Sequence, residues 1–200
     1  MTKIFAHRGA SAYAPENTME AFHLAAKQGA DGIELDVHVT KDGEVVVTHD
    51  EKIDRVSNGS GFIKDMTLRE LKRLSFHNHM ESYVGAGIPT LREVLEYVST
   101  TNMDVNIELK TGIYWYPQIE EKTAFIVQET GMHDRVIYSS FNHHSIAKIK
   151  EIDSTAETAW LFSDVILNVE QYAKANGVEG LHPAVYHMYM SDFMKRWNES

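Results

Sequence analysis

Short apolar runs alternate along the chain with stretches in which apolar residues recur every three or four positions. The runs predict strands at residues 4–9, 32–39, 45–50, 105–109, 135–140, 157–162 and 178–182. The periodic stretches predict helices at 19–29, 67–74, 91–99, 117–130, 143–151, 168–176 and 190–197. Strands and helices that alternate in this way predict an α/β fold with a parallel sheet covered by helices.

Local signals fix the ends of several predicted elements. Asn17 or Thr18 can cap the helix that begins near residue 19, and Gly29 stands where its C-cap belongs. Thr67 with Glu70 has the spacing of a capping box. Residues 41–43 form a tight Lys-Asp-Gly turn that is too short to hold a helix, so one βα unit is expected to be degenerate.

Residues 51–87 differ from the rest of the chain because Gly, Asn, Ser and His are frequent there. Only one short helix is predicted in this segment. Loops of this length are usually functional. We therefore interpret the chain as one domain, residues 1–200, with 51–87 as a segment inserted after the third strand.

Composition narrows the classes of function. The chain has 200 residues and a formal charge of −10, which argues against nucleic acid as a partner. It has no cysteine, so thiolate nucleophiles, disulfides and sulfur-ligated zinc are excluded. No apolar run reaches the ~18 to 20 residues that span a bilayer, and the first strand begins at once. We expect a cytoplasmic protein without stable membrane insertion.

Polar residues stand at the ends of four predicted strands, where parallel strands of a barrel deliver side chains to one rim. The first run ends in His7 and Arg8, the second carries Glu34 and Asp36, the third ends in His49 and Asp50, and the fourth carries Glu108 and Lys110. Histidines can move protons near neutral pH, and carboxylates can hold a hard divalent cation. Arg8 and Lys110 suit a phosphate. The set predicts metal-assisted cleavage of a phosphate ester.

The three carboxylates are the strongest part of this pattern. Glu34 and Asp36 lie two apart on a strand and so share one face. Taken alone, the pair is equally compatible with a solvent-facing edge strand, but Glu108 and Lys110 repeat the same spacing on a second apolar strand. Together Glu34, Asp36 and Glu108 predict an oxygen-only site for one divalent cation, Mg²⁺ or Ca²⁺, with Mn²⁺ as a further candidate.

The two histidines and the nearby aromatic residues each have a structural alternative. A lone histidine at a strand end is more often a hydrogen-bonded structural group, but His7 and His49 stand at matching strand ends beside the carboxylates, which favours catalysis. Phe141 is a candidate wall of the substrate pocket. Residues 114–116, Tyr-Trp-Tyr, either line that pocket or pack over the next helix.

Seven short motifs follow one another in a fixed order between residue 4 and about residue 141. They read His7-Arg8-Gly9, Pro15-Glu16-Asn17-Thr18, Glu34-Leu35-Asp36-Val37, Thr40-Lys41-Asp42-Gly43, His49-Asp50, Glu108-Leu109-Lys110 and Ser140-Phe141. In order and spacing this set resembles the glycerophosphodiester phosphodiesterase family.

The resemblance implies a (β/α)8 TIM barrel that splits glycerophosphodiesters, such as glycerophosphocholine, into an alcohol and glycerol 3-phosphate. It implies that His7 and His49 are the acid/base pair and that Glu34, Asp36 and Glu108 are the metal ligands. It implies that Arg8 and Lys110 bind the phosphate, and that 51–87 is a small subdomain over the barrel mouth.

The end of the sequence departs from this family. Seven strands are predicted where the barrel needs eight, so we expect the last βα segment to be absent from this chain. Three other interpretations stay open: a lysophospholipase D, a phosphoinositide-type phosphodiesterase, and an inactive truncated binding protein. An exposed apolar rim would favour a lipid substrate, whereas the inserted segment is polar and favours a small soluble one. A homo-oligomer is compatible with the sequence.

Overall fold

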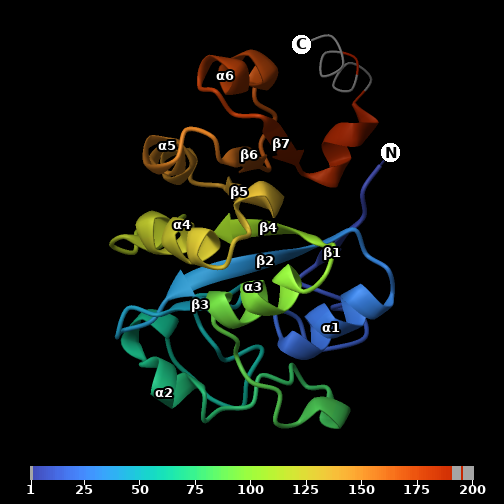
Figure 1. The fold of residues 1–200 in the computed structure, drawn as a ribbon, viewed down its shortest axis with the longest axis vertical. Coiled ribbons are helices and arrows are strands. Elements are labelled where there is room, and N and C mark those ends of the chain that lie inside the picture. Colours follow the sequence, from blue (N-terminus) through green and yellow to red (C-terminus); the bar gives the residue numbers. More distant parts are fainter. Residues whose placement is uncertain (1, 191–194, 196–200) are drawn as a thin grey trace.

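Seven strands form one sheet in the computed structural model, which describes residues 2–190 and residue 195. The strands are β1 (Phe5–His7), β2 (Gly32–Val39), β3 (Val45–Val47), β4 (Asp104–Leu109), β5 (Val136–Ser140), β6 (Glu157–Phe162) and β7 (Gly180–Pro183). The order is β1-β2-β4-β5-β6-β7, with every neighbouring pair parallel, and β3 pairs with β2 (Figure 1). The predicted α/β class and parallel sheet are confirmed. Closure into an eight-stranded barrel and the lack of a last βα segment stay predictions.

Helices follow most of the strands, as the periodic stretches predict. They are α1 (Met19–Lys27), α2 (Leu68–Leu71), α3 (Leu91–Ser99), α4 (Ile119–Glu129), α5 (His143–Ile152) and α6 (Val169–Ala175). Short 3₁₀ turns lie at Ile63–Asp65, Glu81–Tyr83, His133–Arg135 and Val185–Tyr189. The predicted helix at 190–197 falls, apart from Met190 and Lys195, outside the described residues. None of the described helices is long and apolar enough to cross a bilayer.

The orientation of β3 corrects the expectation of a parallel third strand. β3 runs antiparallel to β2, with Val47 opposite Val37 and Val45 opposite Val39. The turn at residues 41–43 explains this, since a parallel partner needs a crossover of a dozen or more residues, whereas a hairpin does not. The backbone N–H of Thr48 donates to the carbonyl of Asp36 at 3.0 Å. The hairpin therefore returns the chain to the level of Asp36 just before His49.

The strands bury one face against the helices. Ile33 and Leu35 of β2 are fully buried and belong to one apolar cluster with Phe22 of α1 and with Leu91 and Leu95 of α3. Each such side chain contributes about 1.5–3 kcal/mol when it leaves water. Since side chains alternate along a strand, Glu34 and Asp36 lie on the opposite face of β2, away from this cluster.

The segment 51–87 has a hydrophobic cluster of its own. Its members are Ile53, Val56, Ile63, Leu71 and Phe76 of the segment, together with Val46 of β3 and Ile88, which precedes α3. The predicted helix there is shorter than expected, but the capping box is present: Thr67 Oγ1 accepts from the Glu70 N–H, and the Glu70 side chain accepts from the Thr67 N–H. The segment is thus folded rather than an extended loop.

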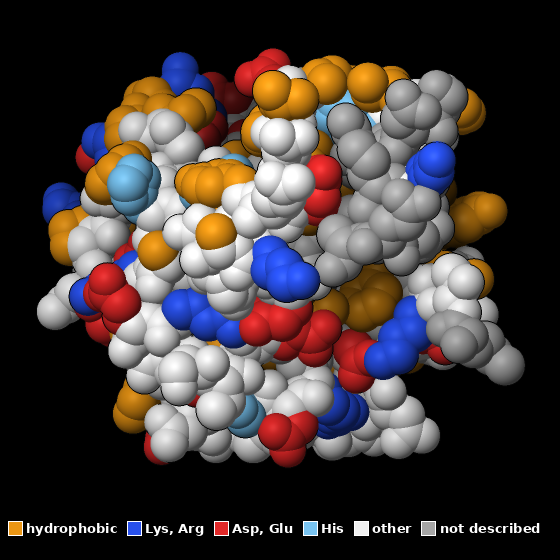
Figure 2. Space-filling view, turned by 90° about the horizontal axis from the view of Figure 1, so that it is seen from above, with side chains coloured by type: hydrophobic (Ala, Val, Ile, Leu, Met, Phe, Trp, Pro, Cys, Tyr) orange, Lys and Arg blue, Asp and Glu red, His pale blue; other side chains and the backbone are white. Residues whose placement is uncertain are grey.

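Charged side chains of both signs are distributed over the surface. Figure 2 shows Lys and Arg side chains scattered among Asp and Glu side chains on one face, with hydrophobic side chains between them. The excess of acidic residues is therefore not gathered into one large patch on this face.

Candidate active site

Three carboxylates meet at the centre of the sheet. Glu34 and Asp36 come from β2, and Glu108 of β4 is the register partner of Asp36. One carboxylate oxygen from each residue lies within 4.8 Å of the other two. The side chains are only 11%, 1% and 11% exposed. The alternative of a solvent-facing edge strand is therefore wrong, and the sequence prediction that these acids cluster is confirmed.

Clustering has an electrostatic cost. Burial and the neighbouring Asp36 raise the pKa of Glu34, and the same two causes raise the pKa of Glu108. Buried like charges are stable only when cations or hydrogen-bond donors compensate them. The side chains that surround the three acids must therefore be considered with them.

Two cationic side chains provide part of this compensation. Lys110 Nζ lies 2.8 Å from Glu108 Oε1 and 3.7 Å from Asp36 Oδ1, and Arg8 Nε lies 3.5 Å from Asp36 Oδ2. Burial opposes the charged form of Lys110, but Glu108 and Asp36 outweigh it and raise the lysine pKa. The structure thus places both predicted phosphate-binding residues beside the carboxylates.

The backbone at Arg8 also serves the site. Arg8 has a left-handed conformation, with φ of 58°, and its N–H donates to Glu34 Oε2 at 2.9 Å. A left-handed residue other than glycine costs roughly 1–2 kcal/mol. Gly9 follows with φ of 76°, and a Cβ there would lie 2.8 Å from the backbone of Ala21 in α1. The turn after β1 is therefore tightly constrained.

The two predicted catalytic histidines lie near this cluster. His7 ends β1, and its Nε2 is 3.8 Å from Glu34 Oε2. Partial burial of the imidazole ring, together with the positive charge of Arg8, lowers the pKa of His7. A lowered pKa keeps this imidazole neutral near pH 7, in the form that can accept a proton.

His49 has a carboxylate partner. Its Nδ1 lies 2.6 Å from Asp50 Oδ1. Although burial favours the protonated acid, hydrogen bonds from Arg55 and His49 lower the pKa of Asp50 to about 2. An ionised acceptor places the ring proton on Nδ1 and leaves Nε2 available to exchange a proton with a ligand.

The donor set suits a divalent cation. Asp36 Oδ1 is buried without a hydrogen-bond partner among the described residues. Carboxylate oxygens are the ligands that Mg²⁺ and Ca²⁺ prefer, and the same cluster supplies one more such oxygen from Glu34 and one from Glu108. An ion there would compensate the charge that Arg8 and Lys110 leave unbalanced.

Several contacts of the site were not assigned from sequence. Asn17 Nδ2 donates to Asp36 Oδ2 at 2.8 Å, and Glu16 accepts from Arg8 at 2.9 Å. Both residues stand in the second of the seven motifs, which was the available signal. Arg55, in the segment 51–87, binds Glu16 and Asp50, and no pattern in the sequence pointed to it.

Of the aromatic residues that follow β4 and β5, one is buried in the protein and two are exposed to solvent. Tyr116 is buried and its hydroxyl lies 2.9 Å from Nδ1 of His38, so here the packing alternative holds. Trp115 is 68% exposed, and Phe141, the candidate pocket wall, is 51% exposed.

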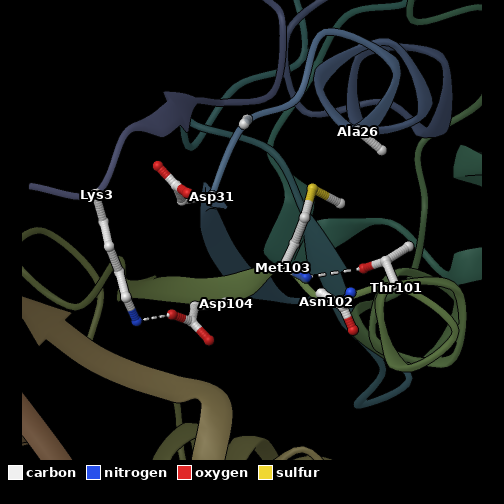
Figure 3. Close-up of a pocket in the computed structure, with 8 residues that line it drawn as sticks. Lys3, Ala26, Asp31, Thr101, Asn102, Met103 and Asp104 are labelled. Carbon is white, nitrogen blue, oxygen red and sulfur yellow. Dashed lines mark hydrogen bonds and ion pairs between the residues drawn. The ribbon is translucent and has the colours of Figure 1, made fainter. Parts of the chain in front are cut away.

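A separate cavity lies at the other end of the strands. It has a volume of about 360 Å³ and lies beside the starts of β2 and β4 (Figure 3). Lys3 pairs there with Asp104, and Asp31 lies beside them. The carboxyl ends of the strands carry the acids and histidines, so this cavity is not part of the candidate site.

Comparison with known proteins agrees with this geometry. The model of the glycerophosphoryl diester phosphodiesterase family matches residues 7–200. The chain belongs to this family. It is 44% identical over 188 residues to a glycerophosphodiester phosphodiesterase of Caldanaerobacter subterraneus, covering 94% of this chain and 77% of that protein. It is 47% identical over 187 residues to one of Bacillus altitudinis, covering 92% and 76%.

Solved structures of the family share the fold. A phosphodiesterase of Oleispira antarctica, whose structure is a complex with the product sn-glycerol-3-phosphate, superimposes with a TM-score of 0.90 at 28% identity. The superposition covers 98% of the present chain and 81% of the Oleispira chain. The resemblance recognised from the seven motifs is confirmed.

Proposed function

We propose that the protein hydrolyses glycerophosphodiesters to an alcohol and glycerol 3-phosphate. The observation that carries the proposal is the convergence of three buried carboxylates, two cationic side chains and two histidines. They come from the middle of β2, from the carboxyl ends of β1 and β4, and from the chain just after β3. The names of the relatives and the product found in the Oleispira structure support this substrate class.

One divalent cation is proposed at Glu34, Asp36 and Glu108, with Mg²⁺, Ca²⁺ and Mn²⁺ as candidates. When bound, such an ion would neutralise charge that builds on the phosphate and would acidify a hydroxyl beside it. The unpartnered Oδ1 of Asp36 and the three converging carboxylates support the site. Arg8 and Lys110 would hold the remaining phosphate oxygens, and Phe141 would form a wall of the pocket.

His7 and His49 are proposed as the acid/base pair. One imidazole would take the proton of the neighbouring glycerol hydroxyl as that oxygen bonds to phosphorus, and the other would protonate the alcohol oxygen as its bond to phosphorus breaks. The cyclic phosphate would then be opened by water, with the roles exchanged, to give glycerol 3-phosphate. Asp50 supports His49 in this role, because it fixes the ring proton on Nδ1.

The whole chain is proposed to be one domain of a TIM barrel type, with 51–87 lying over the mouth of the barrel. Support comes from Arg55 of this segment, which binds Asp50 beside His49 and Glu16 beside Arg8. The segment thereby contacts the site from outside the sheet.

The experiment is an assay of glycerol 3-phosphate release from glycerophosphocholine, with chelator and after addition of Mg²⁺, Ca²⁺ or Mn²⁺. Activity should vanish with chelator and return with at least one ion. His7→Ala and His49→Ala should lower kcat on the order of 10²- to 10⁴-fold, whereas His23→Ala, an exposed position on α1, should not. Full activity in both mutants would refute the histidine assignment, and no activity with any ion would refute the function.

A lipid substrate is a second candidate, because one observation favours it. Ile113, Trp115 and Phe141, in the loops that follow β4 and β5, are 69%, 68% and 51% exposed. An exposed apolar rim beside the site is the feature expected of a lysophospholipase D. The test compares kcat/KM for lysophosphatidylcholine and glycerophosphocholine in the wild type and in Trp115→Ala. If the rim binds acyl chains, only the lipid substrate should lose efficiency in the mutant.

A further inference from the structure

Arg55 binds two carboxylates at once. Its Nε and Nη2 donate to Asp50 Oδ2 and Oδ1 at 2.7 and 3.2 Å. Its Nη1 and Nη2 donate to Glu16 Oε2 and Oε1 at 2.9 and 2.7 Å. All three guanidinium nitrogens are used, and each carboxylate receives a two-point contact. Such forked pairs fix geometry as well as charge.

Each of these carboxylates also contacts a residue of the candidate site. Asp50 Oδ1 lies 2.6 Å from Nδ1 of His49. Glu16 Oε1 accepts from Nη1 of Arg8 at 2.9 Å. The contacts therefore run without interruption from His49 through Asp50, Arg55 and Glu16 to Arg8.

The three residues come from different parts of the chain, so their contacts link segments that are distant in sequence. Glu16 lies between β1 and α1, Asp50 follows the β3 hairpin, and Arg55 belongs to the segment 51–87. These parts of the chain are otherwise joined to the sheet by separate strands. A planar guanidinium can bridge two carboxylates with fixed angles, whereas a lysine ammonium is a point charge on a flexible stem.

We propose that Arg55 is a positioning residue, which holds Asp50 and Glu16 in one plane and so sets the relative orientation of His49 and Arg8. The proposal rests on the proposed function of those two residues. Arg55 is 43% exposed, so its effect is to hold directions rather than to supply a large electrostatic energy. In this way the segment 51–87 would control the catalytic geometry without contacting the substrate through Arg55.

The experiment compares Arg55→Ala, Arg55→Lys and, as a matched control, Arg73→Ala, since Arg73 is an exposed arginine of the same segment. Arg55→Ala should lower kcat on the order of 10- to 100-fold, the loss typical of contacts that support a site. Arg55→Lys should recover only a minor part, and Arg73→Ala should match the wild type. Wild-type activity in Arg55→Lys would overturn the proposal, because charge alone would then suffice.

Two readouts separate positioning from a general loss of structure. The losses of Arg55→Ala and Asp50→Asn should be less than additive in the double variant, because Arg55 acts on His49 through Asp50; fully additive losses would overturn the proposal. Guanidinium at millimolar concentration should restore part of the activity of Arg55→Ala and none of that of Asp50→Asn. Failure of this rescue in a variant that keeps the wild-type melting temperature would also overturn it.

A measurement without substrate distinguishes this inference from the proposed function. In histidine-labelled protein, NMR should show an Nδ1–H proton of His49 protected from exchange by Asp50, assigned by its loss in His49→Ala. The signal should disappear in Arg55→Ala and persist in Arg73→Ala. If it persists in Arg55→Ala, the positioning role is wrong, whether or not the wild type hydrolyses glycerophosphodiesters.

Discussion

The side-chain amide of Asn17 donates a 2.8 Å hydrogen bond from Nδ2 to Oδ2 of the buried carboxylate Asp36. Asn17 itself is buried, has a left-handed backbone with φ of 57°, and donates its N–H to the carbonyl of Arg8 at 3.0 Å. One oxygen of Asp36 is thus fixed by the amide, while Oδ1 is left without a hydrogen-bond partner among the described residues. Asn17 therefore orients Asp36, one of the three carboxylates that we propose as metal ligands.

Replacement of Asn17 by Ala should weaken binding of the divalent cation about 10- to 100-fold, because a metal ligand that loses its supporting hydrogen bond is less well oriented. Calorimetric titration with Mg²⁺, Ca²⁺ and Mn²⁺ would measure this. Asn102→Ala, an exposed change at the opposite end of the strands, is the control and should bind as the wild type does. Equal affinities in the two variants would show that Asn17 has no part in the site.

Much of the site could be predicted because its signal is local. Glu34 and Asp36, and again Glu108 and Lys110, stand two apart on apolar strands, and this spacing alone puts each pair on one face. Parallel pairing then brings Asp36 opposite Glu108. The boundaries of β2, β4 and β6 also follow from their apolar runs.

What could not be predicted depends on contacts between distant parts of the chain. Arg55 looks like any polar residue of a long segment, and only the folded chain brings it against Glu16. The antiparallel direction of β3 could have been predicted, because the turn at residues 41–43 is too short for the crossover that a parallel strand needs. Its consequence, the return of His49 to the level of Asp36, required the register.

Gly9→Ala should destabilise the protein by about 2–4 kcal/mol, because the new Cβ adds a steric clash to backbone strain. The Cβ would lie 2.8 Å from the backbone of Ala21, at φ of 76°. Gly29→Ala is a matched control: its φ is 78°, but nothing lies within 4 Å of its Cβ. The control should cost only about 1 kcal/mol. Urea denaturation of both variants measures the difference. Equal losses of stability would mean that the turn after β1 shifts to accommodate the new Cβ.

Asp50 should make stability depend on pH in the acid range. Its pKa falls from 3.8 to about 2 in the folded protein, since the hydrogen bonds from Arg55 and His49 outweigh burial. A lowered acid pKa stabilises the fold above the unfolded value, and this contribution is lost as the pH falls toward the folded value. Asp50→Asn should thus cost about 1 kcal/mol at pH 6, with the 30% exposed side chain taken into account.

The difference between wild type and Asp50→Asn should shrink as the pH is lowered from 5 toward 3. Urea denaturation across this range measures it. Asp164→Asn, at an exposed position, is the control for the loss of one negative charge. A difference that stays constant with pH would mean that the ion pair with Arg55 does not contribute in solution.

His38 connects Tyr116 to the backbone of His49, and its tautomer follows from its two partners. His38 Nε2 lies 3.0 Å from the carbonyl oxygen of His49, which can only accept, so Nε2 carries the proton. Nδ1 then accepts from the Tyr116 hydroxyl at 2.9 Å. Burial lowers the pKa of His38, which agrees with a neutral ring.

Tyr116→Phe should therefore leave Nδ1 of His38 buried without a donor and cost about 1–3 kcal/mol. Tyr114→Phe removes the same hydroxyl from the neighbouring ring, whose centroid lies 6.3 Å away, and should cost less than about 0.5 kcal/mol. Urea denaturation gives both values, and ¹⁵N NMR of the imidazole reports whether Nε2 keeps its proton. Equal costs for the two tyrosines, or a proton on Nδ1, would contradict this hydrogen-bond assignment and with it the support that His38 gives to the backbone of His49.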